Sequence, residues 1–134
     1  TPLSLRPKEG IAVMNGTGVM TAIACGAFAR AEYLTRLTAR LTALATVALQ
    51  GNSYHFDARL FEVKPHPGQS QIAAWIREDL NAGETPRNSE RLQDRYSIRC
   101  APHVIGVLRD SLPWMRTYIE TELNSVNDNP VIDS

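Results

Sequence analysis

The sequence predicts an all-α fold organised around one long helix. An apolar repeat in steps of three and four residues runs from Thr17 to Gln50 without a proline, and Gly51 follows as a stop signal. Other segments of helical period are separated by prolines, glycines and asparagines. Hydrophobic residues make up 43% of the 134 residues, which is typical of a folded protein rather than a disordered one.

Composition argues against several classes of partner. The formal net charge is zero, so a nucleic-acid partner is not expected, because phosphates require a basic surface. Cys25 and Cys100 lie in apolar helical contexts and are interpreted as reduced thiols of a cytoplasmic protein. His55, His66 and His103 lack the spacing of metal ligands, so no metal site is expected.

The two ends of the sequence suggest part of a longer polypeptide. The chain begins at Thr1 without a methionine or a signal peptide, and it closes on Asp133-Ser134 as if a loop or strand were cut short. Its length suggests one domain. We therefore expect residues 1–134 to be a single interior fragment of the central helical domain of a larger protein.

The first expected element is a short helix over Pro7–Met14, which Pro7 can open at its first position. Ile11, Val13 and Met14 are expected to face inward. Asn15 and Gly16 form a strong turn or cap signal that ends the helix. Asn15 is therefore either a simple cap residue or an amide directed at a ligand.

The long helix over Thr17–Gln50 would measure about 50 Å. Its leucine stripe consists of Met20, Ile23, Ala27, Ala31, Leu34, Leu37, Leu41, Leu44 and Ala48. A second, threonine face consists of Thr35, Thr38, Thr42 and Thr46. Charged residues such as Arg30, Glu32 and Arg36 argue against a membrane span. Since the chain is too short to cover both faces, we expect a helix bundle completed by further sequence, by other subunits, or by both.

The remaining elements are predicted in the same way, from apolar residues at helical spacing and from the prolines, glycines and asparagines that interrupt them. In chain order they are a helix over His55–Val63, a helix from Gln69 or Ser70 to Leu80 with Trp75 in the core, a surface loop over Asn81–Glu90, and a helix over Pro102–Asn124. Pro113 should bend the last helix or remove one hydrogen bond. His66, between two prolines, is a candidate ligand or base, or a packed structural histidine.

The segment Arg91–His103 holds the main candidate site, because Gln93, Tyr96 and Arg99 follow one another in steps of three residues. On a helix, such residues share one side. A guanidinium binds a carboxylate bidentately, a phenol can pass or hold a proton, and a carboxamide both donates and accepts. Together they could hold an amino acid. The alternative is an ordinary surface helix start with solvated arginines.

Four motifs carry a resemblance to a known family. They are Lys8–Thr17 (KEGIAVMNGT), Pro65–Gln69 (PHPGQ), Gln93–Cys100 (QDRYSIRC) and Glu122–Pro130 (ELNSVNDNP). In this order and at these separations the chain closely resembles the aromatic amino acid ammonia-lyase and aminomutase family, which includes histidine, phenylalanine and tyrosine ammonia-lyases. The likeness spans nearly the whole chain.

The resemblance implies an all-α homotetramer and an electrophilic prosthetic group, 4-methylidene-imidazol-5-one (MIO), made from an Ala-Ser-Gly of the protein itself. It implies elimination of ammonia from an aromatic amino acid to leave an α,β-unsaturated acid. In the aminomutases the amine is added back at the β carbon. The implied partners are therefore a small aromatic amino acid, the rest of the polypeptide and further subunits.

The resemblance also implies roles for individual residues. Asn15 matches an asparagine near the prosthetic group and the substrate carboxylate, and Gln93 matches an active-site glutamine. Tyr96 matches a tyrosine whose hydroxyl faces the reacting centre, and Arg99 matches the arginine that binds the carboxylate. Because sites in such tetramers draw on several subunits, Asn15 is expected to come from a different chain than Gln93, Tyr96 and Arg99.

The chain also departs from the family pattern. It contains no Ala-Ser-Gly, and the family's lid-loop tyrosine base, its upstream selectivity residue, its C-terminal glutamate and the phenylalanine beside the prosthetic group are missing. We therefore expect this fragment alone to be inactive. Three functions are open at this point: part of an ammonia-lyase, part of an aromatic amino acid 2,3-aminomutase, or a non-catalytic helical assembly module.

Overall fold

A computed structural model of the chain describes residues 2–81 and 91–126, and these contain helices and no strand. The all-α prediction is confirmed. In chain order the elements are α1 (Glu9–Asn15), α2 (Gly18–Ala48), the 3-10 helix η1 (Ser53–Phe56), α3 (Ala58–Glu62), α4 (Pro67–Leu80), α5 (Tyr96–Arg99) and α6 (Ala101–Leu123). The expected loop over Asn81–Glu90 lies outside the described residues, apart from Asn81.

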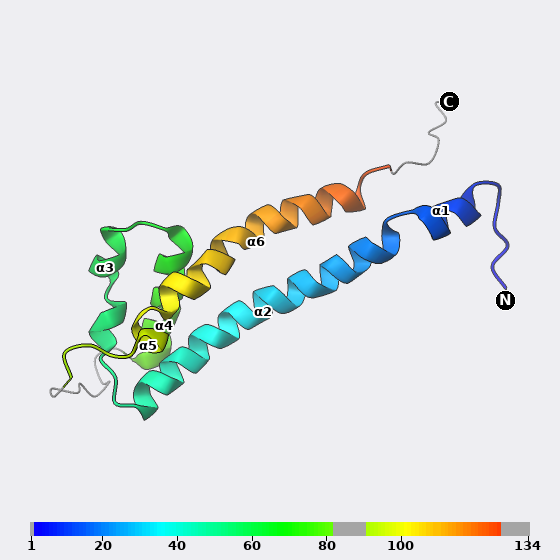
Figure 1. Ribbon diagram of the computed structural model, residues 1–134. Helices are drawn as coiled ribbons and strands as arrows, with labels where there is room; N and C mark the ends of the chain where they lie inside the picture. Colours follow the sequence, from blue (N-terminus) through cyan, green and yellow to red (C-terminus); the bar gives the residue numbers. More distant parts are fainter. Residues whose placement is uncertain (1, 82–90, 127–134) are drawn as a thin grey trace.

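Two long helices set the shape of the molecule (Figure 1). Helix α2 has 31 residues, or about 46 Å at the usual rise per residue, and α6 lies alongside it. Helices α3, α4 and α5 gather at the C-terminal end of α2, whereas α1 lies at the opposite end. The long helix predicted from the apolar repeat is therefore present, two residues shorter at its end than expected.

Helix α2 ends in a Schellman motif, with Gln50 and not Gly51 in the left-handed conformation. The φ angle of Gln50 is 51°, and the Gly51 amide donates to the Thr46 carbonyl at 2.7 Å. A glycine is needed at position 51 for lack of space and not for its backbone conformation. A Cβ there would lie 2.9 Å from both Thr46 Cγ2 and Asp94 Oδ2. The expectation that Gly51 itself is the stop was wrong in this respect.

The threonine face of α2, and not the leucine stripe, packs inside this chain. Thr35, Thr42 and Thr46 are buried, whereas no residue of the leucine stripe is buried. The buried hydroxyls are satisfied because each donates to the carbonyl four residues earlier, as Thr46 does to Thr42 at 2.7 Å. Small threonine and alanine side chains let α4 and α6 pack against α2, and most of the leucine stripe is exposed, with Ala31 and Leu37 half-buried.

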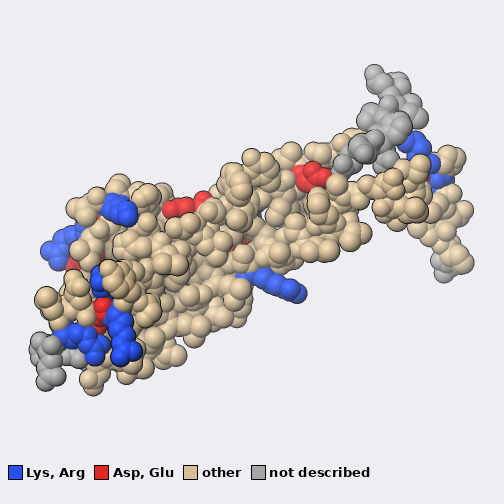
Figure 2. All heavy atoms as spheres, in the orientation of Figure 1, with Lys and Arg blue, Asp and Glu red and all other residues tan. Residues whose placement is uncertain are grey.

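The hydrophobic core lies at the end where α2, η1, α4 and α5 meet. It consists of Ala39, Ala43, Phe56, Ile72, Ile76, Leu80 and Ile98. Trp75 packs against it while remaining partly exposed, as expected for a core-facing aromatic side chain. In Figure 2 the charged side chains gather mainly at this end, and the long middle of the molecule shows few of them.

Helix α1 does not contribute to the core. None of its residues is buried, and Ile11, Val13 and Met14 are 55%, 68% and 82% exposed. The expectation that these three face inward is therefore wrong within this chain, because no described element packs over α1. Its observed start at Glu9 also places Pro7 before the helix.

The middle segments differ from expectation in detail. The expected helix over His55–Val63 is divided into η1 and α3, because Asp57 is extended and its carboxylate accepts the Arg59 amide at 3.0 Å to start α3.

Helix α4 begins earlier than expected, at Pro67, with His66 as its N-cap residue. His66 is exposed, so the described residues do not pack around it. Helix α6 continues through Pro113.

Two facing glycines set the close approach of α4 and α6, and they give a first testable prediction. A Cβ at Gly68 would collide with the Gly106 carbonyl oxygen and lie 2.8 Å from the Asp110 carboxyl. Gly68→Ala is therefore expected to lower the free energy of unfolding of the intact protein by about 1–3 kcal/mol, measured by denaturant titration. Gly26→Ala is the matched control. A Cβ there meets nothing within 4 Å, so a small gain or no change is expected, and equal losses in both variants would contradict the packing described.

Among the described residues, no single helix is long and apolar enough to cross a membrane, although α1 and α2 together, bent by 45°, meet the same test of length and composition.

Candidate active site

The predicted site residues fall into two groups at opposite ends of α2 (Figure 1). Asn15 is the last residue of α1. Tyr96 and Arg99 form the two ends of α5, and Gln93 lies just before that helix. One copy of the chain therefore brings Gln93, Tyr96 and Arg99 into one region and leaves Asn15 far from them.

Tyr96 and Arg99 lie on the same side of α5. The Arg99 Cζ is 4.1 Å from the centroid of the Tyr96 ring, a cation–π distance. Tyr96 is 73% exposed, and Arg99 is half-buried. The phenol and the guanidinium thus present an adjacent pair to the surface, as their spacing predicted.

The predicted helical position of Gln93 is wrong. Arg95 is extended, with a ψ angle of 150°, and α5 begins only after it, at Tyr96. The backbone cannot continue as a helix because Asp94, on the other side of Arg95, is held against residues 52–55. Gln93 is exposed in the segment leading to α5. It is near the pair in sequence but does not share a helical face with it.

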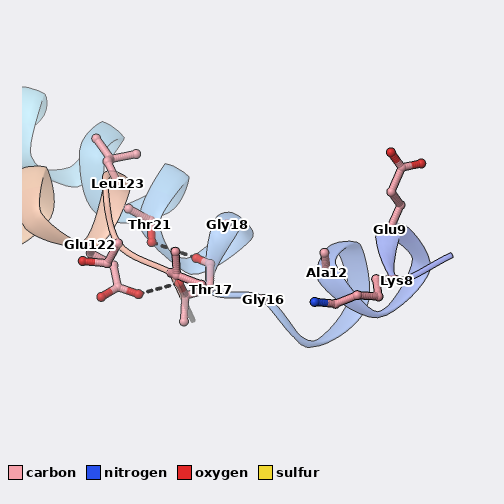
Figure 3. Close-up of a pocket in the computed structure, with 11 residues that line it drawn as sticks. Lys8, Glu9, Ala12, Gly16, Thr17, Gly18, Thr21, Glu122 and Leu123 are labelled. Atoms are coloured by element: carbon pink, nitrogen blue, oxygen red, sulfur yellow. Dashed lines mark hydrogen bonds between the residues drawn. The ribbon is translucent and has the colours of Figure 1, made fainter. Parts of the chain in front are cut away.

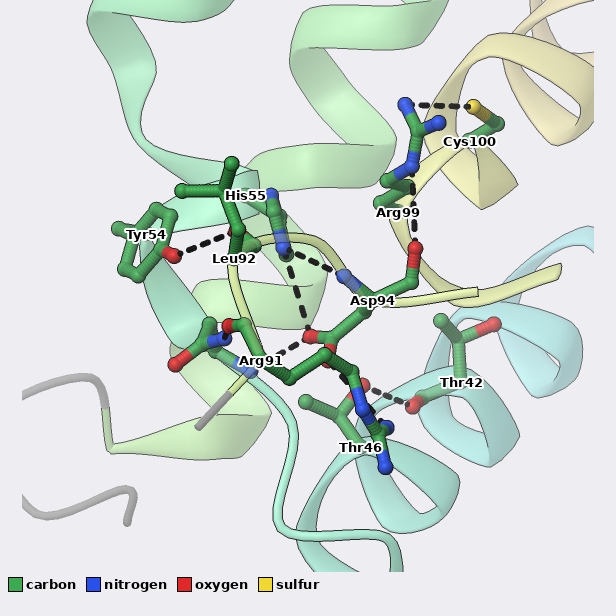
Figure 4. Close-up of polar contacts among 10 residues, drawn as sticks. Thr42, Thr46, Tyr54, His55, Arg91, Leu92, Asp94, Arg99 and Cys100 are labelled. Carbon is green, nitrogen blue, oxygen red and sulfur yellow. Dashed lines mark hydrogen bonds and ion pairs between the residues drawn. The ribbon is translucent and has the colours of Figure 1, made fainter. Parts of the chain in front are cut away.

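Asp94 fixes this segment to the rest of the fold (Figure 4). Its side chain is fully buried. The carboxylate Oδ2 accepts the Asn52 backbone amide at 2.6 Å, and the Asp94 backbone amide donates to His55 Nε2 at 3.1 Å. The Asp94 carbonyl accepts a hydrogen bond from Arg99 Nε at 3.0 Å. Asp94 therefore connects η1 directly to the guanidinium of the candidate site.

His55 is held in its neutral form. Burial lowers the pKa of His55, and the nearby Arg99 charge lowers it further, while Asp94 acts in the opposite direction. The net lowering agrees with the geometry, because the Nε2 that accepts the Asp94 amide must carry a lone pair. The contact of 3.5 Å between Nε2 and Asp94 Oδ2 is therefore not an ion pair at neutral pH.

Asp94 and His55 were not predicted from the sequence as part of the site. They lie 39 residues apart in the chain, and no local periodicity connects them. The one available signal was the position of Asp94 directly after Gln93 in the QDRYSIRC motif. That adjacency does not reveal burial or a partner.

At the other end of α2, the residues after Asn15 border a hollow of about 570 Å³. Thr17 Oγ1 donates to Glu122 Oε1 at 2.5 Å and ties the start of α2 to the end of α6 (Figure 3). Gly16 lines the hollow, and a Cβ there would collide with the Ala12 carbonyl. The Gly16 amide, not the Asn15 side chain, closes the last turn of α1 by donating to Ala12 at 3.2 Å. The Asn15 side chain is exposed, and its role as a ligand-binding amide stays a prediction.

Of the other titratable candidates, Cys100 lies beside the α5 group, with its Sγ 3.9 Å from Arg99 Nη1. The pKa of His103 is lowered by burial and by the Lys64 charge, and its ring packs against Phe61 at 5.5 Å between centroids. Cys25 and Cys100 are free and half-buried.

In residues 2–81 and 91–126, no three His, Cys, Asp or Glu side chains come together as metal ligands. The motif residues Asn127–Pro130 lie outside the described part of the chain.

Comparison with known proteins connects this geometry to a family. The family model described as aromatic amino acid lyase matches residues 1–134. Over 98% of its length the chain is 38% identical to the histidine ammonia-lyase of Mus musculus and 41% identical to the phenylalanine ammonia-lyase of Nostoc punctiforme, of which it covers 21% and 25%. It is 40% identical to the histidine ammonia-lyase of Koribacter versatilis, again over 98% of its length and 26% of that protein. The chain spans about a fifth to a quarter of these relatives, and it belongs to the aromatic amino acid lyase family.

Proposed function

We propose that the intact protein containing this chain is an ammonia-lyase acting on an aromatic L-α-amino acid, and that the α5 region holds the head group of the substrate. The observation that carries the proposal is the pairing of Tyr96 and Arg99, with the guanidinium 4.1 Å from the ring on an exposed side of α5. Family membership supports the reaction class.

Arg99 is assigned the role of binding the substrate carboxylate. Its charge persists at any pH near neutrality, and its planar fork matches a carboxylate. The Nε–H is engaged by the Asp94 carbonyl, which fixes the plane of the guanidinium. The η nitrogens at its outer edge are left to meet the ligand, apart from a 3.9 Å contact of Nη1 with Cys100 Sγ.

Tyr96 is assigned to the reacting centre. Elimination breaks the C–N bond and a β C–H bond, forms a C=C bond and releases ammonia and a proton. A phenol beside this centre can hold or pass a proton, or bind the departing amine. The contact with Arg99, whose Cζ lies 4.1 Å from the centre of the ring, places the phenol next to the group assigned to the carboxylate.

Gln93 and Asn15 are assigned as uncharged hydrogen-bonding groups. Gln93 precedes α5 and is exposed, so it can reach the same ligand from the side. Asn15 lies at the far end of α2, and we propose that it completes a site of another subunit in a homotetramer. The exposed leucine stripe of α2 supports packing between chains.

The prosthetic group of the family, MIO, fits this assignment in part. The chain has no Ala-Ser-Gly from which to form it, so another part of the polypeptide would have to provide it. Asn15 could adjoin it, because its exposed carboxamide directly precedes Gly16, which lines the hollow, and a carboxamide is a suitable donor to a carbonyl oxygen. When present, the group supplies an electrophile for the substrate.

The substrate and the outcome of the reaction are tested together. The relatives named above include histidine and phenylalanine ammonia-lyases, so the intact protein should be assayed with L-histidine, L-phenylalanine and L-tyrosine. We expect an α,β-unsaturated acid and one equivalent of ammonia from at least one of them. Formation of a β-amino acid instead would favour the aminomutase alternative, and no turnover of any of the three would refute the proposal.

One observation favours a non-catalytic assembly module as a second candidate. The leucine stripe leaves a long apolar surface that serves packing and not chemistry. The same assay separates the two candidates, because an assembly module would form oligomers of defined size and give no product. A cytoplasmic location is part of the proposal in either case.

A further inference from the structure

We propose that Asp94 and His55 are positioning residues for Arg99: a buried hydrogen-bond chain from the His55 imidazole through the Asp94 backbone sets where the guanidinium meets the substrate carboxylate. The inference rests on the proposed function, in which Arg99 binds that carboxylate. Neither residue touches the substrate in this account. Both act through the orientation of Arg99.

The hydrogen-bond chain runs through the backbone of Asp94, whose amide contacts His55 and whose carbonyl contacts Arg99. The Asp94 amide donates to His55 Nε2 at 3.1 Å, and the Asp94 carbonyl accepts from Arg99 Nε at 3.0 Å (Figure 4). The carboxylate accepts the Asn52 amide at 2.6 Å. Asp94 is therefore held at three points, and one of these is the candidate substrate-binding arginine.

The burial of Asp94 shows that this arrangement is built into the fold. Its side chain has no exposed surface, and that of His55 has 11%. Removing a carboxylate from water is costly unless it is paired. The nearest cation, Arg91, is 3.8 Å from Oδ1, and that oxygen has no hydrogen-bond partner in the described residues.

Two further hydrogen bonds hold the segment before Asp94 against the start of η1. The Asn52 side-chain amide donates to the Arg91 carbonyl at 3.3 Å, and the Tyr54 hydroxyl donates to the Leu92 carbonyl at 3.1 Å. These bonds fix the path of the chain, but they do not reach Arg99. Tyr54 therefore offers a control that weakens the same loop without breaking the connection to the guanidinium.

The surroundings leave Asp94 little freedom to move. A Cβ at Gly51 would lie 2.9 Å from both Asp94 Oδ2 and Thr46 Cγ2, so the end of α2 is pressed against the carboxylate. Because the site is tightly packed, loss of one hydrogen-bond partner cannot be repaired by a large shift of Asp94. Without the His55 acceptor the buried Asp94 amide has lost its partner, and a small rotation of the backbone at residues 93–95 would also move the carbonyl that holds Arg99 Nε.

His55→Leu in the intact protein is the first test, because leucine fills space but cannot accept the Asp94 amide. We expect the KM for the amino acid and the inhibition constant of the product acid to rise about five- to tenfold, with kcat changed less than twofold. His55→Gln, whose side-chain oxygen can reach the same amide, should restore both constants to within about twofold of the unaltered protein.

Two comparisons separate positioning from general damage. The primary amide of the product acid lacks the charge that Arg99 binds, so its inhibition constant should not change in His55→Leu. In an Arg99→Ala background, His55→Leu should add no further loss, because both changes act through one guanidinium. Tyr54→Phe is the matched control and should leave the KM unchanged.

The outcomes are distinguishable. If the unaltered protein does not turn over any aromatic amino acid, the proposed function fails and this inference fails with it. If it is active and His55→Leu leaves the KM unchanged, or weakens acid and amide binding equally, only the positioning role is overturned. Should His55→Leu not fold, His55→Asn, whose shorter amide cannot reach Asp94, serves the same test with the same expected rise.

Discussion

Replacing Arg99 with alanine in the intact protein is expected to raise the KM for the aromatic amino acid by about 10- to 150-fold. The physical reason is the loss of a charged hydrogen-bonding partner for the carboxylate, which typically weakens binding by about 1.5–3 kcal/mol. Steady-state kinetics with the preferred substrate and the inhibition constant of the product acid would measure the effect. An unchanged KM would contradict the assigned role.

Arg95 provides the matched control for this experiment. It lies four residues before Arg99, is exposed, and contributes its backbone to the start of α5. Arg95→Ala removes the same charge from the same region, so its KM should change by less than about twofold if long-range attraction contributes little. Equal effects of the two substitutions would indicate general electrostatic attraction and not a specific carboxylate site.

Replacing Tyr96 with phenylalanine is expected to lower kcat by about 10²- to 10⁴-fold, the range typical of a lost proton-transfer group. The substitution keeps the ring, and with it the contact to Arg99, so the KM should change little. A fall in kcat with an unchanged KM indicates an interaction made only in the transition state. A change in the KM alone would make Tyr96 a binding group and nothing more.

Tyr33 is a suitable control for the tyrosine substitution. It is exposed on α2 and lies away from α5 in the chain. Tyr33→Phe removes the same hydroxyl without touching the Tyr96–Arg99 pair, so kcat should be unaffected. Comparable losses in both variants would point to an effect on assembly, which the size of the oligomer in solution would reveal.

The helices of this fold follow from local sequence, and the faces they bury do not. The apolar repeat predicts α2 because its period and the lack of proline act within the helix itself. Which face of α2 is buried depends on which helices pack against it. Here the threonine face is buried, because its small side chains allow other helices to come closer than the leucine stripe would. Period alone contains no information on neighbouring elements.

The part of the candidate site that depends only on positions along one helix was predictable from the sequence. Tyr96 and Arg99 share a side of α5 because they are three positions apart on one turn of helix. The position of Gln93 was not predictable, since Asp94 is held by residues 39 and 42 positions earlier in the chain and forces Arg95 into an extended conformation. Tertiary contacts of this kind override helix period. The placement of Asn15 in the site of another subunit stays a prediction for the same reason.

The most direct test of this account is a crystal structure of the intact protein with the product acid bound. We predict the carboxylate within about 3 Å of the Arg99 guanidinium, the Tyr96 hydroxyl facing the double bond, and an Asn15 from another subunit at the same ligand. A carboxylate held by a different cation, with Arg99 buried in contacts between subunits, would contradict it.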